Sequence, residues 1–176
     1  MRRGFPADRR SRRPVLGATL CVLCASCDLV GLMQPPFAGT WTGEDATATP
    51  IGGTLPTLEL TLGRDEYLWL DRVPDASGRL ADSSGLKGAL SARGGVITLS
   101  IDFVGQPPFD ANGLPQGALV WAEPGSSSYE AVAALLPSTT LQARYDIAGA
   151  TMTLVPDLNG DGSFDEYDPT LSLTKL

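Results

Sequence analysis

Hydrophobic and polar side chains alternate with a period of two along most of the chain after residue 36. Leu58, Leu60 and Leu62, for example, are separated by Glu59 and Thr61, which is the pattern of a strand with one buried face. The pair at residues 94–95 is Gly-Gly, which is typical of a two-residue hairpin turn. The alternation predicts strands over residues 57–62, 67–71, 86–93, 97–103, 141–147, 152–154 and 170–176.

About eight or nine short strands joined by tight turns indicate a mostly β protein, an antiparallel meander that forms either a barrel or a sandwich. We expect a closed barrel, because the last strand can pair with the first and so remove both open edges of the sheet. In the run 97–103, four apolar side chains are expected to share the buried face: Ile97, Leu99, Ile101 and Phe103.

Two segments depart from the strand pattern. Ser127 to Leu136 is rich in helix formers, with Glu130 three residues after Ser127 as in a capping box and Pro137 at its end, so it predicts one short helix. Gly105 to Gly117 contains three prolines and little periodicity. We expect a long loop there, over one mouth of the barrel.

The first 27 residues have the order of a secretory signal peptide. Six arginines precede an apolar run of twelve residues, Val15–Ser26, which is shorter than the roughly 20 residues that span a bilayer. The run ends at Ala25-Ser26-Cys27, which resembles the lipobox of bacterial lipoprotein precursors, with Cys24 where that family usually has Leu. The resemblance implies cleavage before Cys27, a lipid such as palmitate on that cysteine, and a membrane-anchored protein of the cell envelope, on the periplasmic side or the cell surface.

Other outcomes of the export segment stay open. Cleavage near Ser26 would release a soluble secreted protein, and an uncleaved segment would act as an anchor. Ser11 to Leu16 also resembles the twin-arginine export motif, which would carry the chain across the membrane already folded. In each case residues 1–27 are the export signal, residues 28–36 a short tether, and residues 37–176 the barrel domain.

Composition excludes several function classes. Residues 28–176 hold seven Lys and Arg against nineteen Asp and Glu, a net charge of −12, which is unfavourable for binding nucleic acid. The chain has no histidine, and all three cysteines (Cys21, Cys24, Cys27) lie in the export segment. A Ser-His-Asp triad and the commonest zinc ligand are therefore absent, and we assign no catalytic residue.

The segment Gly39-Thr40-Trp41, after Phe37, resembles the first motif of lipocalin-like domains. The resemblance implies a barrel whose closed end is filled by Trp41, on which a late basic residue, either Arg144 or Lys175, packs. It also implies a small apolar ligand in the barrel mouth. The alternative is a filled barrel in which Trp41, Trp69 and Trp121 are core residues.

The segment Asp157 to Asp168 resembles the twelve-residue calcium loop of EF-hand and dockerin modules. Such a loop takes oxygen ligands at positions one, three, five, seven, nine and twelve, with glycine at six. The match implies weak calcium binding in a hairpin between the last two strands, because a strand and Pro169 flank the loop instead of helices; the alternative is a plain polar turn. The six matching residues are Asp157, Asn159, Asp161, Ser163 through its carbonyl, Asp165 and Asp168, with Gly162 at six.

Two further acidic pairs, Glu44-Asp45 and Asp65-Glu66, are expected to be solvated turn residues. The leading functional interpretation is thus an envelope lipoprotein acting as a non-enzymatic binding module, for a small apolar ligand or a protein partner, with calcium bound in the last hairpin. The alternative is a structural envelope module with a filled core. An enzyme ranks third.

Overall fold

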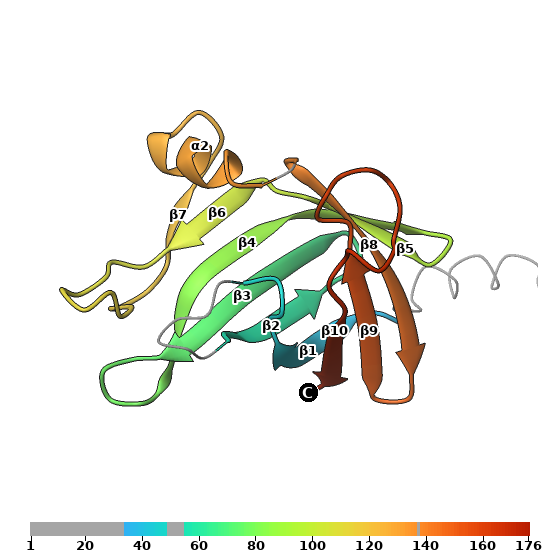
Figure 1. Ribbon diagram of the computed structural model, residues 1–176, viewed down its shortest axis with the longest axis horizontal. Coiled ribbons are helices and arrows are strands. Elements are labelled where there is room, and N and C mark those ends of the chain that lie inside the picture. The colour runs from blue at the N-terminus through green and yellow to red at the C-terminus, as the bar shows by residue number, and fades with distance from the viewer. Residues whose placement is uncertain (1–33, 49–54, 137) are drawn as a thin grey trace, which may run out of the picture. The chain divides into compact units, whose positions relative to one another are not determined.

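The computed structural model describes residues 34–48, 55–136 and 138–176 (Figure 1). Pro35–Leu176 form one compact unit. The predicted export signal, including Cys27, and the tether up to residue 33 lie outside the described residues.

Ten strands and one helix are found in the described part of the chain. Their bounds are β1 (Gly39–Glu44), β2 (Thr57–Leu62), β3 (Glu66–Pro74), β4 (Leu80–Arg93), β5 (Val96–Ser100), β6 (Phe103–Gln106), β7 (Val120–Ala122), α2 (Ser127–Ala133), β8 (Thr140–Ala148), β9 (Thr151–Pro156) and β10 (Leu171–Lys175).

Eight of these strands close into an antiparallel barrel. The order is β3-β2-β1-β10-β9-β8-β5-β4, and the pairing of β3 with β4 completes the ring. The predicted pairing of the last strand with the first is confirmed, with Trp41 opposite Lys175. β6 and β7 extend the sheet from β4, outside the closed ring.

The predicted single strand over residues 97–103 is wrong at its end. β5 stops at Ser100, and a separate β6 begins at Phe103 and pairs with a different part of β4. The break lies beside Gly88, where an added Cβ would overlap the Ser100 carbonyl oxygen. Phe103 consequently lies opposite Lys87, whose ammonium is 4.7 Å from its ring, and not on the face that Ile97 and Leu99 bury.

The helix is shorter than predicted and begins with a different cap. Ser126, and not Ser127, is the N-cap residue, and its hydroxyl accepts the amide of Tyr129. Glu130 accepts the amide of Gly125 in return, so the capping interaction reaches one residue further back than a standard capping box. The helix ends at Ala133.

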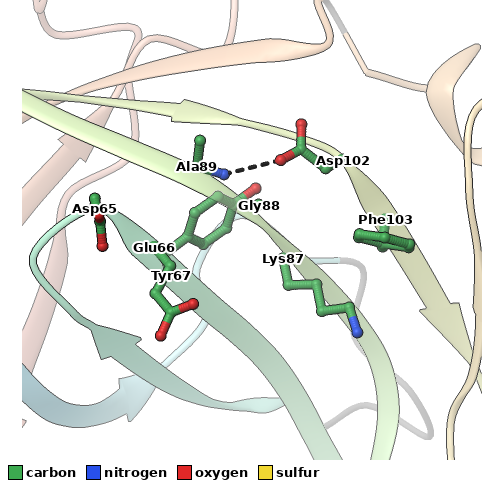
Figure 2. A pocket seen from close by; sticks show the side chains of 8 residues that line it. All are labelled: Asp65, Glu66, Tyr67, Lys87, Gly88, Ala89, Asp102 and Phe103. Carbon is green, nitrogen blue, oxygen red and sulfur yellow. Dashed lines mark hydrogen bonds between the residues drawn. The ribbon is translucent and has the colours of Figure 1, made fainter.

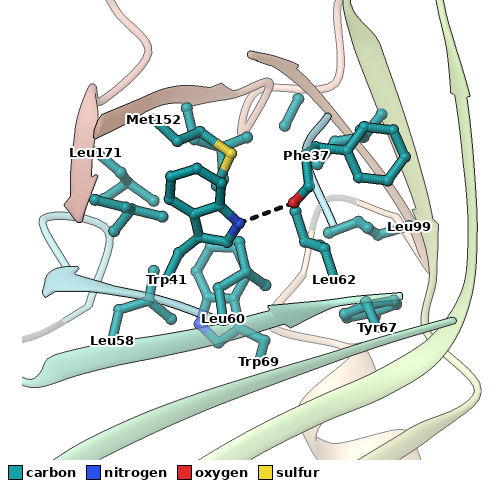
Figure 3. Packing of buried hydrophobic residues seen from close by; sticks show 14 of the residues in the cluster. Phe37, Trp41, Leu58, Leu60, Leu62, Tyr67, Trp69, Leu99, Met152 and Leu171 are labelled. Atoms are coloured by element: carbon teal, nitrogen blue, oxygen red, sulfur yellow. Dashed lines mark hydrogen bonds between the residues drawn. The ribbon is translucent and has the colours of Figure 1, made fainter. Parts of the chain in front are cut away.

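Large apolar side chains fill one part of the barrel interior (Figure 3). Trp41 is fully buried at its centre, where its indole Nε1 donates to the Phe37 carbonyl at 2.9 Å. The strand register places Trp41, Leu60 and Trp69 in one row across β1, β2 and β3. Burial of such a cluster supplies the hydrophobic stabilisation that a chain with no cysteine after Cys27 needs.

Candidate functional site

A cavity of about 350 Å³ lies at the barrel end toward which β1 and β3 run. It lies between Trp69 of β3, Leu86 of β4, the residues 45–48 that follow β1, and α2 with the turn after it. The described lining residues are Asp45, Thr47, Ala48, Trp69, Asp71, Ser84, Gly85, Leu86, Gly105, Gln106, Val132, Leu135, Leu136, Leu141 and Leu158. We call this space the end cavity.

The end cavity exists because the side chains on the inner face of β3 and β4 become shorter toward this end of the barrel. Trp69 on β3 is part of the filled core, whereas the next residues on the same face, Asp71 on β3 and Ser84 opposite it on β4, are short. Successive same-face positions lie two residues apart in a strand, so the two short side chains leave space where the core would otherwise continue.

The helix α2 is held over the end cavity by a second, smaller apolar cluster. Tyr129 is buried in this cluster and donates from its hydroxyl to the Ile101 carbonyl at 2.6 Å. Val132, Leu135 and Leu136 follow on the side that lines the end cavity. The segment after Gln106, predicted to cover a barrel mouth, instead joins β6 to β7 outside the ring, and the end cavity is covered by α2.

Two carboxyl groups meet in the wall of the end cavity. Asp71 accepts the hydroxyl of Ser84 at 2.6 Å and the indole N–H of Trp69 at 3.1 Å. Asp45 lines the same cavity and is near enough to raise the pKa of Asp71. Asp45 accepts the amide and hydroxyl of Thr47 at 2.7 and 2.5 Å. We call Asp45 and Asp71 the carboxyl pair.

The environment of Asp71 favours its protonated form. Burial, with a smaller contribution from the neighbouring Asp45, raises the pKa of Asp71 to about 7, against the opposing effect of the hydrogen bonds from Ser84 and Trp69. A second carboxyl group nearby acts in this direction because like charges repel. Asp71 therefore binds a proton more readily than an ordinary aspartate.

The prediction that Asp45 is a solvated turn residue is wrong. Asp45 is 1% exposed, whereas its neighbour Glu44 is exposed as expected. The β1–β2 loop folds inward after Glu44, and the Asp45 amide donates to the Pro56 carbonyl. Asp71 continues the alternation of Tyr67 and Trp69, so it lies on the face of β3 on which those two side chains are buried. Nothing in the local pattern indicated that Asp45, distant in the sequence, would meet it.

The structure decides which basic residue packs on Trp41. The Lys175 ammonium lies 5.2 Å from the indole ring and donates to the Ala38 carbonyl at 3.0 Å. Arg144 instead lies 5.7 Å from the ring of Phe164. Trp121 is not part of the main core cluster. Its ring packs on Gly105, and the Lys87 ammonium lies 4.3 Å from it.

The predicted calcium loop connects β9 to β10, as expected, and folds through its own side chains. The two carboxylate oxygens of Asp157 accept the amides of Gly160 and Gly162 at 2.8 and 2.9 Å. Asp168, near the other end, accepts the amides of Leu158 and Asp165 at 3.2 and 3.3 Å. Asp157 and Asp168 are buried.

The other predicted ligands lie at the exposed side of this loop. Asn159 and Asp161 are joined by a 3.1 Å hydrogen bond, and Asp161 and Asp165 each accept an amide two residues onward. Ser163 is exposed between them. Among the described residues, no three acidic side chains converge on one point in an arrangement that could hold a metal ion. The oxygen-rich composition suits calcium, but here the carboxylates bind backbone amides.

A second depression, of about 500 Å³, lies at the outer junction of β3, β4 and β6 (Figure 2). Asp65 and Glu66 at its rim are exposed, as predicted for turn residues. Asp102 accepts the amide of Ala89 at 3.1 Å. The hydroxyl of Tyr67 is buried and has no hydrogen-bond partner among the described residues. Burial, followed by Asp102, raises the pKa of that phenol. The depression is more open and less apolar than the end cavity, which makes it a weaker candidate.

No protein-family model, curated protein or solved structure matches this chain. The closed eight-stranded antiparallel barrel is consistent with the lipocalin-like architecture that Gly39-Thr40-Trp41 suggested. Within residues 34–48, 55–136 and 138–176, no helix has the length and apolar character needed to cross a membrane.

Proposed function

We propose that this protein is a non-enzymatic binding module that holds a small, largely apolar ligand in the end cavity. The observation that carries the proposal is the end cavity itself: a space of about 350 Å³ in the end of an otherwise filled barrel, lined mainly by apolar side chains. Ligand pockets in proteins are commonly of about 300–1,000 Å³, apolar, with a few polar groups at defined positions.

The test uses pyrene, a neutral apolar fluorophore of suitable size, titrated into the purified protein. We expect saturable binding with one site per chain. Ala48→Trp places a large ring from the β1–β2 loop into the end cavity and should remove the binding. Ala111→Trp, which adds the same ring to an exposed turn, is the matched control and should bind pyrene like the parent. Equal binding by both variants would place the ligand elsewhere.

The filled core favours a second candidate, a structural envelope module. Fifteen buried residues pack in the main cluster, from Phe37 to Leu173, and fill much of the described barrel interior. A structural module requires no ligand. Absence of saturable pyrene binding by the parent, together with no small molecule carried by the natively purified protein, would favour this second function.

The module is proposed to act at the cell envelope, exported by residues 1–27 and anchored through a lipid on Cys27. Lipid anchoring depends on burying acyl chains, at about 0.8 kcal/mol per methylene, and stable anchoring takes two or more chains. Mass spectrometry of protein purified from membranes should find a chain that begins at a lipid-bearing Cys27. Cys27→Ser should stay unprocessed or soluble. An unmodified chain that begins at another residue would overturn the anchor.

Calcium binding by the loop between β9 and β10 is part of the same proposal. Asp157, Asn159, Asp161, Asp165 and Asp168 supply side-chain oxygens, and Ser163 supplies its carbonyl. Calcium would replace backbone amides as the partner of Asp157 and Asp168, and would stiffen the loop that leads from Leu158, a lining residue of the end cavity.

A further inference from the structure

We propose that the ligand of the end cavity carries a protonated amine on an apolar body, with the ammonium group bound by Asp45 and Asp71. The inference rests on the proposed function, because it specifies the ligand of the same cavity. Three observations carry it: the two carboxyl groups line the same cavity, no lysine or arginine is found among its described lining residues, and apolar side chains form most of the rest of the lining.

The carboxyl groups are already arranged as acceptors. Ser84 and Trp69 hold Asp71 by two hydrogen bonds, and Thr47 holds Asp45 by two more. Each carboxyl is therefore fixed before a ligand arrives, so that binding costs little side-chain entropy. An ammonium group has three donors and no acceptor, which fits carboxylate oxygens, because these can only accept.

No lysine or arginine is found among the described residues that line the end cavity. Arg72, next to Asp71 on β3, points to the opposite face by strand alternation and pairs there with Glu59 and Asp82. In a protein whose residues 28–176 carry a net charge of −12, a cationic ligand is also attracted over a longer range.

Other titratable groups near the end cavity are turned to partners of their own. Glu130 of α2 accepts the amide of Gly125, and Asp157 of the loop after β9 accepts the amides of Gly160 and Gly162. Asp45 is the charged group that acts on Asp71. An ammonium group therefore competes with the proton that Asp71 otherwise binds.

The rest of the lining accounts for the apolar body. Val132 of α2, Leu136 in the turn after it, Leu86 of β4 and Leu141 of β8 supply apolar lining. A metal ion fits less well, since calcium and magnesium take six or more oxygen ligands and the lining supplies mostly hydrocarbon. An apolar amine satisfies both regions at once.

The test compares three pyrene derivatives of similar size with the full chain: 1-pyrenemethylamine, 1-pyrenemethanol and 1-pyrenecarboxylate. At pH 8 the amine should bind about 10- to 100-fold more tightly than the alcohol, the range expected of charge-assisted hydrogen bonds. The carboxylate should bind worst. The amine preference should fall as the pH is lowered from 8 to 5, because the pKa of Asp71 is raised to about 7 and its protonation removes the charge that binds the ammonium group.

Variants assign the effect to the carboxyl pair. Asp45→Asn and Asp71→Asn should each reduce the preference for the amine over the alcohol at least tenfold, on the same reasoning. Glu44→Gln removes an equal charge one residue from Asp45, on an exposed side chain, and should keep the preference. Circular dichroism of each variant checks folding, and the pH profile of the parent tests the proposal independently of any variant.

The outcomes separate the two proposals. Binding of pyrene and the alcohol without a preference for the amine would overturn this inference and leave the proposed function standing. Failure of all the probes to bind would overturn both. An amine preference that is equal in Asp45→Asn, Asp71→Asn and Glu44→Gln would come from the overall negative charge and would also overturn it. An amine preference that both Asn variants lose supports it.

Discussion

Replacement of Trp41 by alanine should destabilise the barrel more than any single change outside its core. Trp41 is fully buried, and its ring touches the cluster built by β1, β2, β9 and β10 (Figure 3). Large-to-small changes of this kind cost about 3–5 kcal/mol, because the transfer energy of the ring and a cavity term are lost together. In a domain of this size about 1 kcal/mol corresponds to a Tm shift of roughly 2–4 °C, so we expect a decrease of about 6–20 °C.

Two further variants divide the effect of Trp41 into its parts. Trp41→Phe keeps an aromatic ring but loses the N–H that donates to the Phe37 carbonyl, which should cost about 1–3 kcal/mol. Lys175→Met removes the ammonium group above the indole, worth about 1 kcal/mol. The ordering of the free energies of unfolding should therefore be wild type, Lys175→Met, Trp41→Phe and Trp41→Ala, from most to least stable.

The assay is urea unfolding of the full chain followed by far-ultraviolet circular dichroism, with thermal unfolding as a second measure. Tyr167→Ala is the control, since it removes an aromatic ring of which 81% is exposed and should change stability by less than about 0.5 kcal/mol. If Trp41→Ala unfolds at the same urea concentration as Tyr167→Ala, Trp41 does not hold the barrel together and the packing argument is refuted.

Three other changes test separate parts of the structure. Gly88→Ala should cost at least about 2 kcal/mol in urea unfolding, because the new Cβ overlaps the backbone where β5 ends. Asp71 has a raised pKa, so the folded state binds more protons than the unfolded state between pH 4 and about 7, and stability falls as pH rises through that window. Asp71→Asn lacks this effect, so its free energy of unfolding relative to the parent should increase from pH 4 to 7 and then level off. Calcium at about 10⁻⁴ to 10⁻³ M should raise the Tm, magnesium should do so poorly, and the double change of Asp157 and Asp161 to Ala should abolish the response.

Matched controls accompany these three predictions. Gly78→Ala adds a methyl group in open space at a positive φ of 79°, and should cost only about 1 kcal/mol, less than Gly88→Ala. Glu44→Gln should follow the pH dependence of the parent, which would assign the effect to Asp71 and not to charge in general. The double change of Asp75 and Asp110 to Ala, in two other turns, should keep the calcium response. A calcium response shared by both double variants would contradict a site in the predicted loop.

Alternation along the chain was enough to predict much of the barrel. A strand with one buried face is a local property, so Leu58, Leu60 and Leu62 identify β2 without knowledge of its neighbours. The hairpin at Gly94-Gly95 is equally local, because both residues have a positive φ that glycine adopts without strain. Closure of β1 on β10 followed from the same reasoning about unpaired sheet edges.

The break after β5, the buried Asp45 and the end cavity depended on approaches between segments distant in the sequence. Phe103 continues the alternation of residues 97–103 in the sequence. The strand is broken before Phe103, however, where the backbone passes close to Gly88, and the ring of Phe103 lies on the outer face beside Lys87. Asp45 has the local sequence pattern of an exposed turn residue. In the folded chain it is near Asp71, which lies 26 positions later in the sequence. Alternation with a period of two indicates on which face of a strand a side chain lies. It does not indicate which residues from other parts of the chain pack against that face. The carboxyl pair and the cavity beside it are products of that long-range packing.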